Sequence, residues 1–566
     1  MKKLISLTIL PALFLFVLVS CQDDFLDGPA QGVLSEAVLN NQNGVEASLI
    51  AAYSMLDGFP GGGWAAGGSN SVLGSMASDD AYKGSEPGDQ QPMTDVELYQ
   101  WATQGTDNYM ADKWRVVYRS VNRANSTLNL LNGLEEGGIS ASDRQRIEGE
   151  VRFLRAHYHF EGYKVWENIP YYTEVDEDFR KGNSEPALPL IIADMQAAIN
   201  LLPIDQNSIG RVTQWTAKAY LGKLQVWAGD YAGAKATLDD VVNNGPYELR
   251  ECFHDPFTAG ADENGSETVL AFQASTNDGT TNGENGNRND RLNFPHGGSP
   301  FGCCGFHQPS QNLVNAHKVD ASGLPFLDGS FNNSDVEVST PVDPRLDWNV
   351  GRDDVPFLDW GLHTPNWIRD RAWAGPYSPK KHIYEQGSDA RSSVGWNNAH
   401  LSSQNTHLLR YADVLLLLAE AEVELSNLDR AREIVNEIRT RAGNCAQGPE
   451  EGPIEVAISD PSITWATYQI GTYDDPWTDQ GAARAAVRME RRLELAMEGH
   501  RFFDLRRWGI AEQVLNQYIS VEQTRRQYLT AAAPYTERHN IYPLPTVQIE
   551  LATVDGEQRL VQNPGW

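Results

Sequence analysis

The sequence predicts a mainly α-helical protein, a tetratricopeptide-like solenoid of about four helical hairpins that carries one large, irregular, loop-rich insertion. Apolar residues recur at three- and four-residue steps over residues 107–243, 404–442 and 481–508, which is the period of amphipathic helices. Between residues 245 and 403 this period fades, and Gly, Asn, Pro, Asp and aromatic residues dominate. Repeat scaffolds place insertions of this kind on one face, where binding usually occurs.

Changes in composition and periodicity divide the chain into segments. In chain order we expect a lipoprotein signal peptide over 1–20, an N-terminal anchor and loop segment over 21–106, helical repeats over 107–244, an aromatic-rich, ligand-binding insertion over 245–403, and helical repeats with a C-terminal signature segment over 404–566.

The amino terminus has the pattern of an export signal. Two lysines precede the uncharged apolar stretch 4–19, which is too short for a comfortable membrane span. This stretch runs into Leu18-Val19-Ser20-Cys21, which resembles a bacterial lipobox. We therefore expect Cys21 to be the lipid attachment site and the first residue of the mature chain, whose acyl chains would anchor the protein to a membrane without crossing it. A plain signal peptide with an incidental cysteine is the alternative.

The helical stretches contain a repeated hairpin. After a first helix around residues 114–131, helices are expected over about 142–166, 187–202, 213–228 and 231–243, with Gly, Pro and Asn between them. Residues 218–242 align with residues 415–439, so that Gly222 matches Ala419 and Leu238 matches Val435. Small residues at the matched positions let paired helices approach closely, as in a degenerate tetratricopeptide-like hairpin.

Tryptophan is concentrated in the insertion. Five of the 15 tryptophans fall there among polar and turn residues: Trp348, Trp360, Trp367, Trp373 and Trp396. An indole can stack on the apolar face of a sugar ring while neighbouring polar side chains bind its hydroxyls, and it can also pack against a peptide side chain. We expect one or two of these indoles to be exposed ligand platforms; the alternative is that they form the small core of the insertion. Trp64, set among glycines, is a further candidate for contact with a ligand or a partner; local packing is the alternative.

The cysteines other than Cys21 are Cys252, Cys303, Cys304 and Cys445. Export permits disulfides, but the sequence does not choose among the possible pairings, which include a bridge between the adjacent Cys303 and Cys304. Neither a C-x-x-C motif nor a nearby histidine pair accompanies them, and the Asn/Asp-rich loop lacks a calcium-loop pattern, so we expect no metal and no cofactor.

The charge of the chain limits its partners. The 566 residues include 45 Lys and Arg against 76 Asp and Glu, giving a formal net charge of −31, which would fall to −33 once cleavage before Cys21 removes two lysines. Such a chain repels phosphates, so nucleic-acid binding is not expected. For the same reason a neutral glycan is a better candidate ligand than a polyanionic one.

Acidic residues between 490 and 504 suggest catalysis at first sight: Glu490, Glu494, Glu498, His500 and Asp504. Arginines alternate with them, so we expect opposite charges three or four residues apart to hold them in a structural ion-pair network, with ionised carboxylates unsuited to general acid catalysis. The nucleophile-elbow, phosphate-loop and H-E-x-x-H motifs are also missing from the sequence, so no catalytic residues are expected.

The same segment, Glu490-Arg491-Arg492-Leu493-Glu494-Leu495-Ala496-Met497-Glu498-Gly499-His500-Arg501-Phe502-Phe503-Asp504-Leu505-Arg506-Arg507-Trp508-Gly509, resembles the signature of SusD/RagB-type outer-membrane lipoproteins. Further similar pieces occur in the same order along the chain: Cys21-Gln22-Asp23-Asp24-Phe25-Leu26, Ala77-Ser78-Asp79-Asp80-Ala81, Tyr542-Pro543-Leu544-Pro545 and Gln562-Asn563-Pro564-Gly565-Trp566. The resemblance implies a lipid-anchored protein exposed at the surface of the outer membrane. It also implies a partner, a TonB-dependent outer-membrane transporter (SusC-like), to which a captured nutrient is delivered.

Together, these features predict a binding protein that captures an oligosaccharide. Two alternatives remain: a peptide-binding member of the same family, which would share the scaffold, and a surface glycoside hydrolase, whose carboxylates have no fixed sequence spacing.

Overall fold

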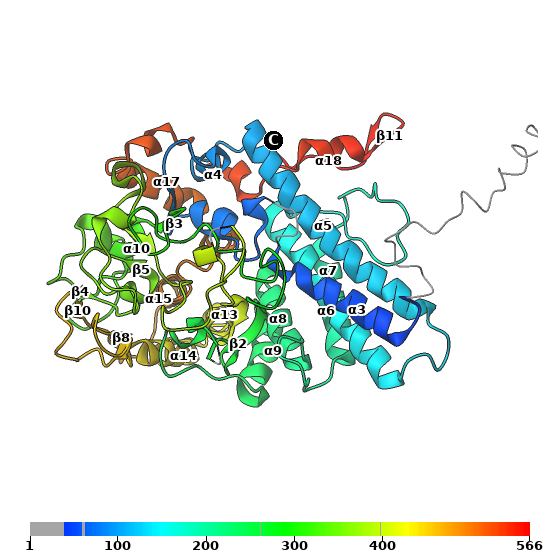
Figure 1. Ribbon diagram of the computed structural model, residues 1–566, viewed down its shortest axis with the longest axis horizontal. Helices are drawn as coiled ribbons and strands as arrows, with labels where there is room; N and C mark the ends of the chain where they lie inside the picture. Colours follow the sequence, from blue (N-terminus) through cyan, green and yellow to red (C-terminus); the bar gives the residue numbers. More distant parts are fainter. Residues whose placement is uncertain (1–38, 59–62, 261, 397) are drawn as a thin grey trace, which may run out of the picture.

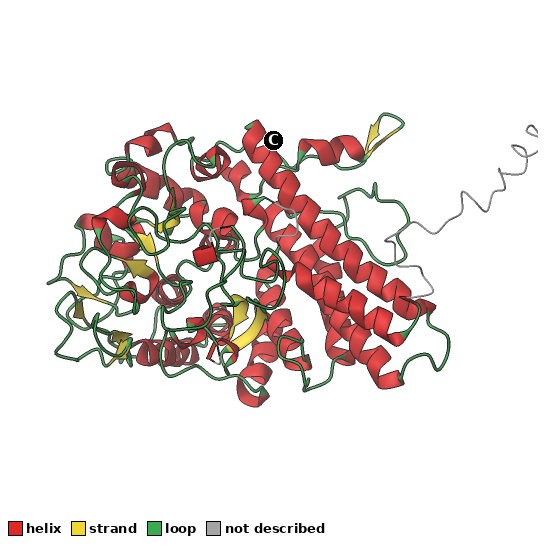
Figure 2. Ribbon diagram, viewed as in Figure 1, coloured by secondary structure: helices red, strands yellow, loops and turns green. Residues whose placement is uncertain are grey.

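The computed structural model describes residues 39–58, 63–260, 262–396 and 398–566. The expected signal peptide and Cys21 lie outside the described residues. In the part that is described, long helices lie side by side on one side of the molecule, and short strands and loops make up much of the other (Figures 1 and 2). The predicted fold class, a mainly α-helical protein with a loop-rich insertion, is confirmed.

The helical half begins with α3 (Gln42–Tyr53) and continues through α5 (Gln104–Gly133), α6 (Ala141–Trp166), α7 (Ala187–Leu201), α8 (Gln214–Trp227) and α9 (Tyr231–Asn244). From α5 to α9, each helix packs on the next, and α9 packs on α13 (Tyr411–Glu424). Side chains set the starts of these helices: Thr103 accepts the amide of Thr106 before α5, and Ser140 accepts that of Asp143 before α6.

The two hairpins aligned in the sequence, α8–α9 and α13–α14 (Leu428–Ala442), adopt matching conformations. Their turns contain Gly229 and Ser426, which occupy aligned positions and both have left-handed backbones, with φ of 72° and 64°. A Cβ on Gly222 would lie 2.2 Å from Leu238 Cδ2, so the close approach of α8 and α9 requires a glycine there. The expectation that small residues bring these helices together is therefore correct at this position.

The insertion leaves the helical scaffold and returns to it at one place. Strand β2 (Thr268–Phe272) near its start pairs antiparallel with β7 (Thr406–Arg410), which leads directly into α13. The ribbon of β1 (Ala81–Gly84) and β3 (Phe306–Pro309) joins the insertion to the N-terminal segment. The strands in the described residues form two-stranded ribbons of this kind, without a larger sheet.

The C-terminal part supplies α15 (Gln480–Glu494), α16 (Arg501–Arg507), α17 (Ala511–Glu522) and α18 (Thr546–Leu551). Helix α15 packs on both α13 and α14, whereas the short α18 packs against α5 in the helical half. Among the described residues, no helix has both the length and the apolar character that crossing a bilayer would require.

Candidate ligand-binding surface

Two of the candidate tryptophans lie in the core of the insertion. The Trp348 side chain is 0% exposed and stacks on His254, with the ring centres 4.7 Å apart. Trp367 is also buried, with its ring edge against Phe357 at 5.3 Å. Neither indole offers a free face to a ligand in this conformation. For these two residues the structure therefore favours the alternative reading, the core of the insertion, over a ligand platform.

Trp360 lies at the edge of the same apolar cluster. Its Nε1 donates to the carbonyl oxygen of Tyr384 at 2.8 Å, and its ring lies 4.7 Å from that of Phe301. The residue is half-buried, so part of its surface remains accessible, but its hydrogen bond and ring contacts are internal. The structure thus brings Trp348, Trp360 and Trp367 together in one cluster and leaves Trp373 and Trp396 outside it.

Trp373 is held between the insertion and the C-terminal part. It lies in the short helix α12 (Arg371–Ala374), and its half-buried ring stacks on Tyr528 at a centroid distance of 3.9 Å. The ammonium group of Lys83 lies 5.6 Å from the ring centre. The indole Nε1 is buried and has no hydrogen-bond partner among the described residues. Because a buried donor without an acceptor costs free energy, this N–H is a candidate contact for a ligand oxygen.

Trp396 is the exposed indole of the set. Its side chain is 59% exposed, and the Arg291 guanidinium lies 4.8 Å from the ring centre. Arg291 itself is buried, and its Nε and Nη2 make no hydrogen bond to a described residue. Burial is the larger cause, and repulsion from Arg288 the smaller, that lower the pKa of the Arg291 side chain below its usual range. The stacked cation supports one face of the indole and leaves the remainder open to solvent.

Trp64 lies in a different segment but close to this surface in the fold. It begins the short 3₁₀ helix η3 (Trp64–Ala66) and packs, half-buried, against the main core. The backbone amide of Gly68, two residues after η3, donates to Asn289 Oδ1 at 2.8 Å. Asn289 lies two residues before Arg291 in the sequence. The Trp64 segment therefore borders the loop that supports Trp396. Its role in ligand contact stays a prediction, as do those of the five insertion tryptophans.

The carboxylates of the signature segment lie in a buried ion-pair network. Glu490 and Glu494 lie one turn apart on α15, and Glu498 lies in the turn that follows this helix. Their cationic partners come from distant parts of the chain: Arg345, Lys381, Arg410, Arg439 and Arg441. The prediction that these three glutamates pair with arginines three or four residues away is therefore wrong. Asp504 does pair locally, with Arg507 three residues further on.

The neighbouring arginines of the signature bind other elements instead. Arg492 pairs with Asp80 at 3.0 Å, and Arg501 binds Asp79 through two nitrogens at 2.8 and 3.0 Å. Burial alone would raise the pKa of Glu494, but the surrounding guanidinium groups outweigh that effect and lower the pKa to about 2. A carboxylate held ionised in this way cannot deliver a proton near neutral pH, so the network suits a structural role.

The four cysteines that the structure describes pair as Cys252–Cys445 and Cys303–Cys304. The first bridge joins the start of the insertion to the end of α14. Within the described ranges, two groups have the spacing of possible metal sites, Cys303 and Cys304 with His400, and Cys252 and Cys445 with Glu455. In both groups the sulfurs are bonded to each other and are therefore not thiolates that could bind a metal.

Sequence reasoning identified the tryptophans but missed their supports, Arg291, Lys83 and Tyr528. These residues lie far from Trp373 and Trp396 in the chain, and no periodicity connects them. The available signal was weak: Arg291 is one of few cations in the Asn- and Gly-rich stretch of the insertion.

Two family models match the chain. A model described as the SusD family matches residues 266–566, and one described as starch-binding associating with outer membrane matches residues 51–226. Among curated proteins, the SusD-like protein P25 from Formosa agariphila is 23% identical over 571 residues, which cover 95% of each chain.

Solved structures show the same fold. A laminarin-binding SusD-like protein superposes with a TM-score of 0.66 at 22% identity, covering 93% of this chain and 100% of the other. Surface glycan-binding protein A from Bacteroides thetaiotaomicron, in complex with laminarihexaose, superposes with a TM-score of 0.65 at 18% identity, covering 92% and 99%.

Proposed function

This chain belongs to the SusD family, and from that premise we propose that it captures an oligosaccharide and passes it to a TonB-dependent outer-membrane transporter of the SusC type. In this proposal the protein binds the glycan without cleaving it. Cys21 carries the lipid that anchors the protein at the outer face of the outer membrane. The family description of association with the outer membrane supports this location.

The exposed indole of Trp396 is the observation that carries the proposed glycan binding. An indole that is 59% exposed, with a cation fixed against one face, presents a rigid apolar plane to solvent. Sugar rings stack on such planes through their C–H faces. Two structurally similar proteins have names that state laminarin binding or a laminarihexaose complex, which supports a glycan as the ligand class.

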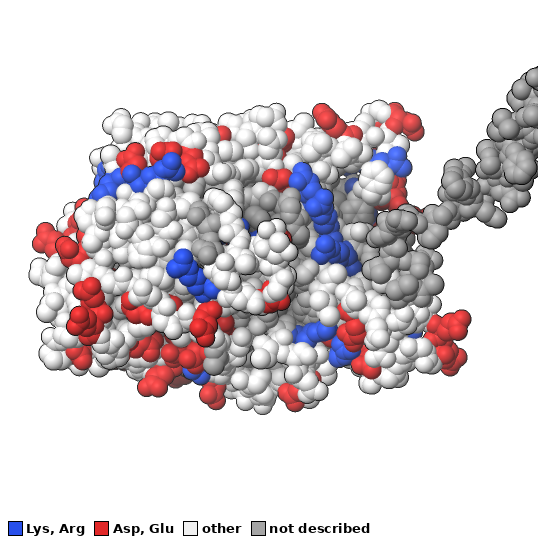
Figure 3. Space-filling view, in the orientation of Figure 1, with Lys and Arg blue, Asp and Glu red and all other residues white. Residues whose placement is uncertain are grey.

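The charge of the protein favours a neutral glycan. On the face seen in Figure 3, acidic side chains gather mainly at the left and along the lower part, and basic side chains form a few separate groups, one of them a short row right of centre. A body of net charge −31 repels a sulfated or uronic-acid polymer at long range, whereas a neutral chain experiences no such repulsion.

Calorimetry with the purified chain lacking residues 1–20 tests the proposed ligand class. The probes are a panel of neutral hexasaccharides from laminarin, starch, cellulose and xylan. Trp396→Ala should weaken binding by about 1–3 kcal/mol, the range for loss of an aromatic stacking platform. Trp465→Ala is the matched control, because this half-buried indole lies outside the insertion and donates to Tyr468 Oη at 3.1 Å.

Other results would replace the proposal. Tight binding of a peptide library without any glycan signal would make the protein a peptide-binding member of the family. Release of reducing ends from a polysaccharide, abolished by a single Asp or Glu substitution, would make it a glycoside hydrolase. For the anchor, Cys21→Ala should release the protein from the membrane fraction; retention with unchanged lipid labelling would refute the proposed attachment site.

A further inference from the structure

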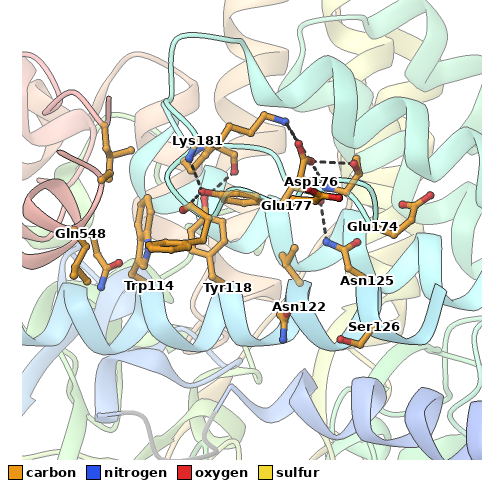
Figure 4. A pocket seen from close by; sticks show the side chains of 18 of the residues that line it. Trp114, Tyr118, Asn122, Asn125, Ser126, Glu174, Asp176, Glu177, Lys181 and Gln548 are labelled. Carbon is orange, nitrogen blue, oxygen red and sulfur yellow. Dashed lines mark hydrogen bonds and ion pairs between the residues drawn. The ribbon is translucent and has the colours of Figure 1, made fainter. Parts of the chain in front are cut away.

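A cavity of about 390 Å³ lies in the helical half of the molecule. It is enclosed by α5, the segment 170–181 and the C-terminal segment around α18 (Figure 4). All its lining residues come from 114–181 and 548–560, so it is separate from the insertion. Its volume falls within the range of about 300–1,000 Å³ that is typical of small-molecule sites.

Aromatic rings form one wall of this α5–α18 cavity. Tyr118 and Tyr172 are half-buried and stand perpendicular to each other, with ring centres 5.6 Å apart. Trp114, one helical turn before Tyr118 on α5, is buried and packs against Tyr118 at 4.5 Å. Two further lining residues are exposed: Phe179, in the segment 170–181, is 74% exposed, and Leu551, the last residue of α18, is 57% exposed. Large apolar side chains exposed together at the rim of a cavity are typical of a binding site.

Hydrogen bonds hold the walls in place without a ligand. Tyr118 Oη donates to the carbonyl of Pro170 at 2.9 Å, and Tyr172 Oη donates to that of Phe179 at 2.5 Å. The side chain of Asn183 forms two bonds with the backbone of Val561, at 2.9 and 3.0 Å, which tie the loop to the C-terminal segment. A site whose walls are already ordered loses little conformational entropy when a ligand binds.

Several polar side chains of the lining are uncommitted. Asn122, Ser126 and Asn129 follow each other at steps of four and three on one face of α5, and Gln548 approaches from α18. In the described part of the chain, none of these four side chains makes a hydrogen bond. Amides and hydroxyls offer both donors and acceptors, which is what the hydroxyl groups of a sugar need.

The ionic groups that line the cavity are mostly acidic, with Glu174, Asp176 and Glu177 against one cation, Lys181. Glu174 pairs with Arg155, and Asp176 pairs with Lys181 at 3.1 Å, as the dashed lines from Asp176 in Figure 4 show for the second pair. Glu177 is left without a cationic partner among the described residues. Burial raises the pKa of Tyr172 to about 12, so its phenol stays neutral. An anion would meet an uncompensated carboxylate here, whereas a neutral ligand would not.

We propose that the α5–α18 cavity is a second carbohydrate site that holds a neutral sugar ring against the half-buried rings of Tyr118 and Tyr172, with its hydroxyl groups at the uncommitted amides of α5 and α18. The inference rests on the proposed glycan-binding function and extends it to the helical half. Two separate sites on one body would hold a polysaccharide with greater avidity than either site alone, because the second contact becomes intramolecular.

Hydrogen exchange measured by mass spectrometry, with the same panel of neutral hexasaccharides, tests the second site. A hexasaccharide that binds should slow exchange in segments 170–181 and 546–560. Asn122→Phe places a ring at the cavity lining and should abolish that protection. Asn108→Phe is the matched control, because Asn108 is exposed on the same helix but does not line the cavity.

The outcomes separate the two proposals. Protection of 170–181 that survives Trp396→Ala and is lost in Asn122→Phe supports the second site. Binding that protects only the insertion overturns the second site and leaves the proposed function standing. The absence of protection anywhere, with every hexasaccharide of the panel, overturns both. Circular dichroism of each variant verifies that the fold is retained.

Discussion

The Arg410 guanidinium and the Glu498 carboxylate form a two-bond ion pair inside the protein, with Nε to Oε2 at 2.9 Å and Nη2 to Oε1 at 2.8 Å. Both residues are buried. Arg410 also binds Glu494 and Glu267, so one guanidinium connects strand β7, which follows the insertion, to the signature segment.

Removing this guanidinium should strongly destabilise the fold. Arg410→Gln leaves buried carboxylates without their main counter-charge, and breaking a buried pair in this way costs about 3–5 kcal/mol. Urea unfolding followed by circular dichroism measures the loss. Arg430→Gln is the control, because its pair with Glu433 is largely solvated and worth at most about 1 kcal/mol. Equal losses in the two variants would contradict the structural role of the network.

Stability should fall in acid. The pKa of Glu494 in the folded chain is about 2, below its ordinary value of about 4.3. Its stabilising contribution is therefore complete at pH values above the ordinary pKa. The contribution is lost as the pH falls towards 2. The pKa of Glu498 is also held below its usual range: burial opposes this shift, and Arg410 and Lys381 outweigh it. The free energy of unfolding, measured at a series of pH values, should decrease between about pH 5 and pH 2. A flat profile over this interval would contradict the prediction.

The two disulfides should differ in their effect on stability. Cys252 and Cys445 are 193 residues apart, so their bridge closes a long loop, and the double serine variant should lose about 2–5 kcal/mol. The Cys303–Cys304 bridge encloses no intervening residues and should contribute much less. Urea unfolding of both double variants, in oxidising buffer, measures the difference. A larger loss from the adjacent pair would reverse this interpretation.

Two tryptophans of the insertion should respond in opposite ways. Trp348→Ala removes a fully buried indole and should cost about 3–5 kcal/mol of unfolding free energy. Trp396→Ala alters an exposed residue and should change stability by no more than about 0.5 kcal/mol. Thermal unfolding followed by circular dichroism gives both values. A severe loss from Trp396→Ala would mean that its indole is part of the core.

The helical scaffold could be predicted closely from the sequence because its helices are amphipathic and well separated by Gly, Pro and Asn. The segments expected over 142–166 and 213–228 are α6 (Ala141–Trp166) and α8 (Gln214–Trp227). Helices α3 and α17 were missed. Helix α3 lies in the segment 21–106, which the sequence predicts as anchor and loop, and α17 follows the charged signature segment.

The candidate site was less predictable, because burial in the insertion depends on contacts between distant residues. Trp348 and Trp396 have similarly polar neighbours in the sequence, yet one is enclosed by His254 and the other rests on Arg291. The cavity beside α5 was missed for a related reason. Trp114 and Tyr118 have the spacing of core residues, and only the fold brings the C-terminal segment across from them.

The β2–β7 ribbon brings the two ends of the insertion together beside α13. Because the insertion leaves and rejoins the scaffold at adjacent strands, its length and sequence can change while the helices of the scaffold keep their positions. Such changes would also have to preserve the β1–β3 ribbon and the Cys252–Cys445 bridge, which tie the insertion to other parts of the fold. A changed insertion would need to retain the few cations that reach the signature carboxylates, Arg345 and Lys381 among them.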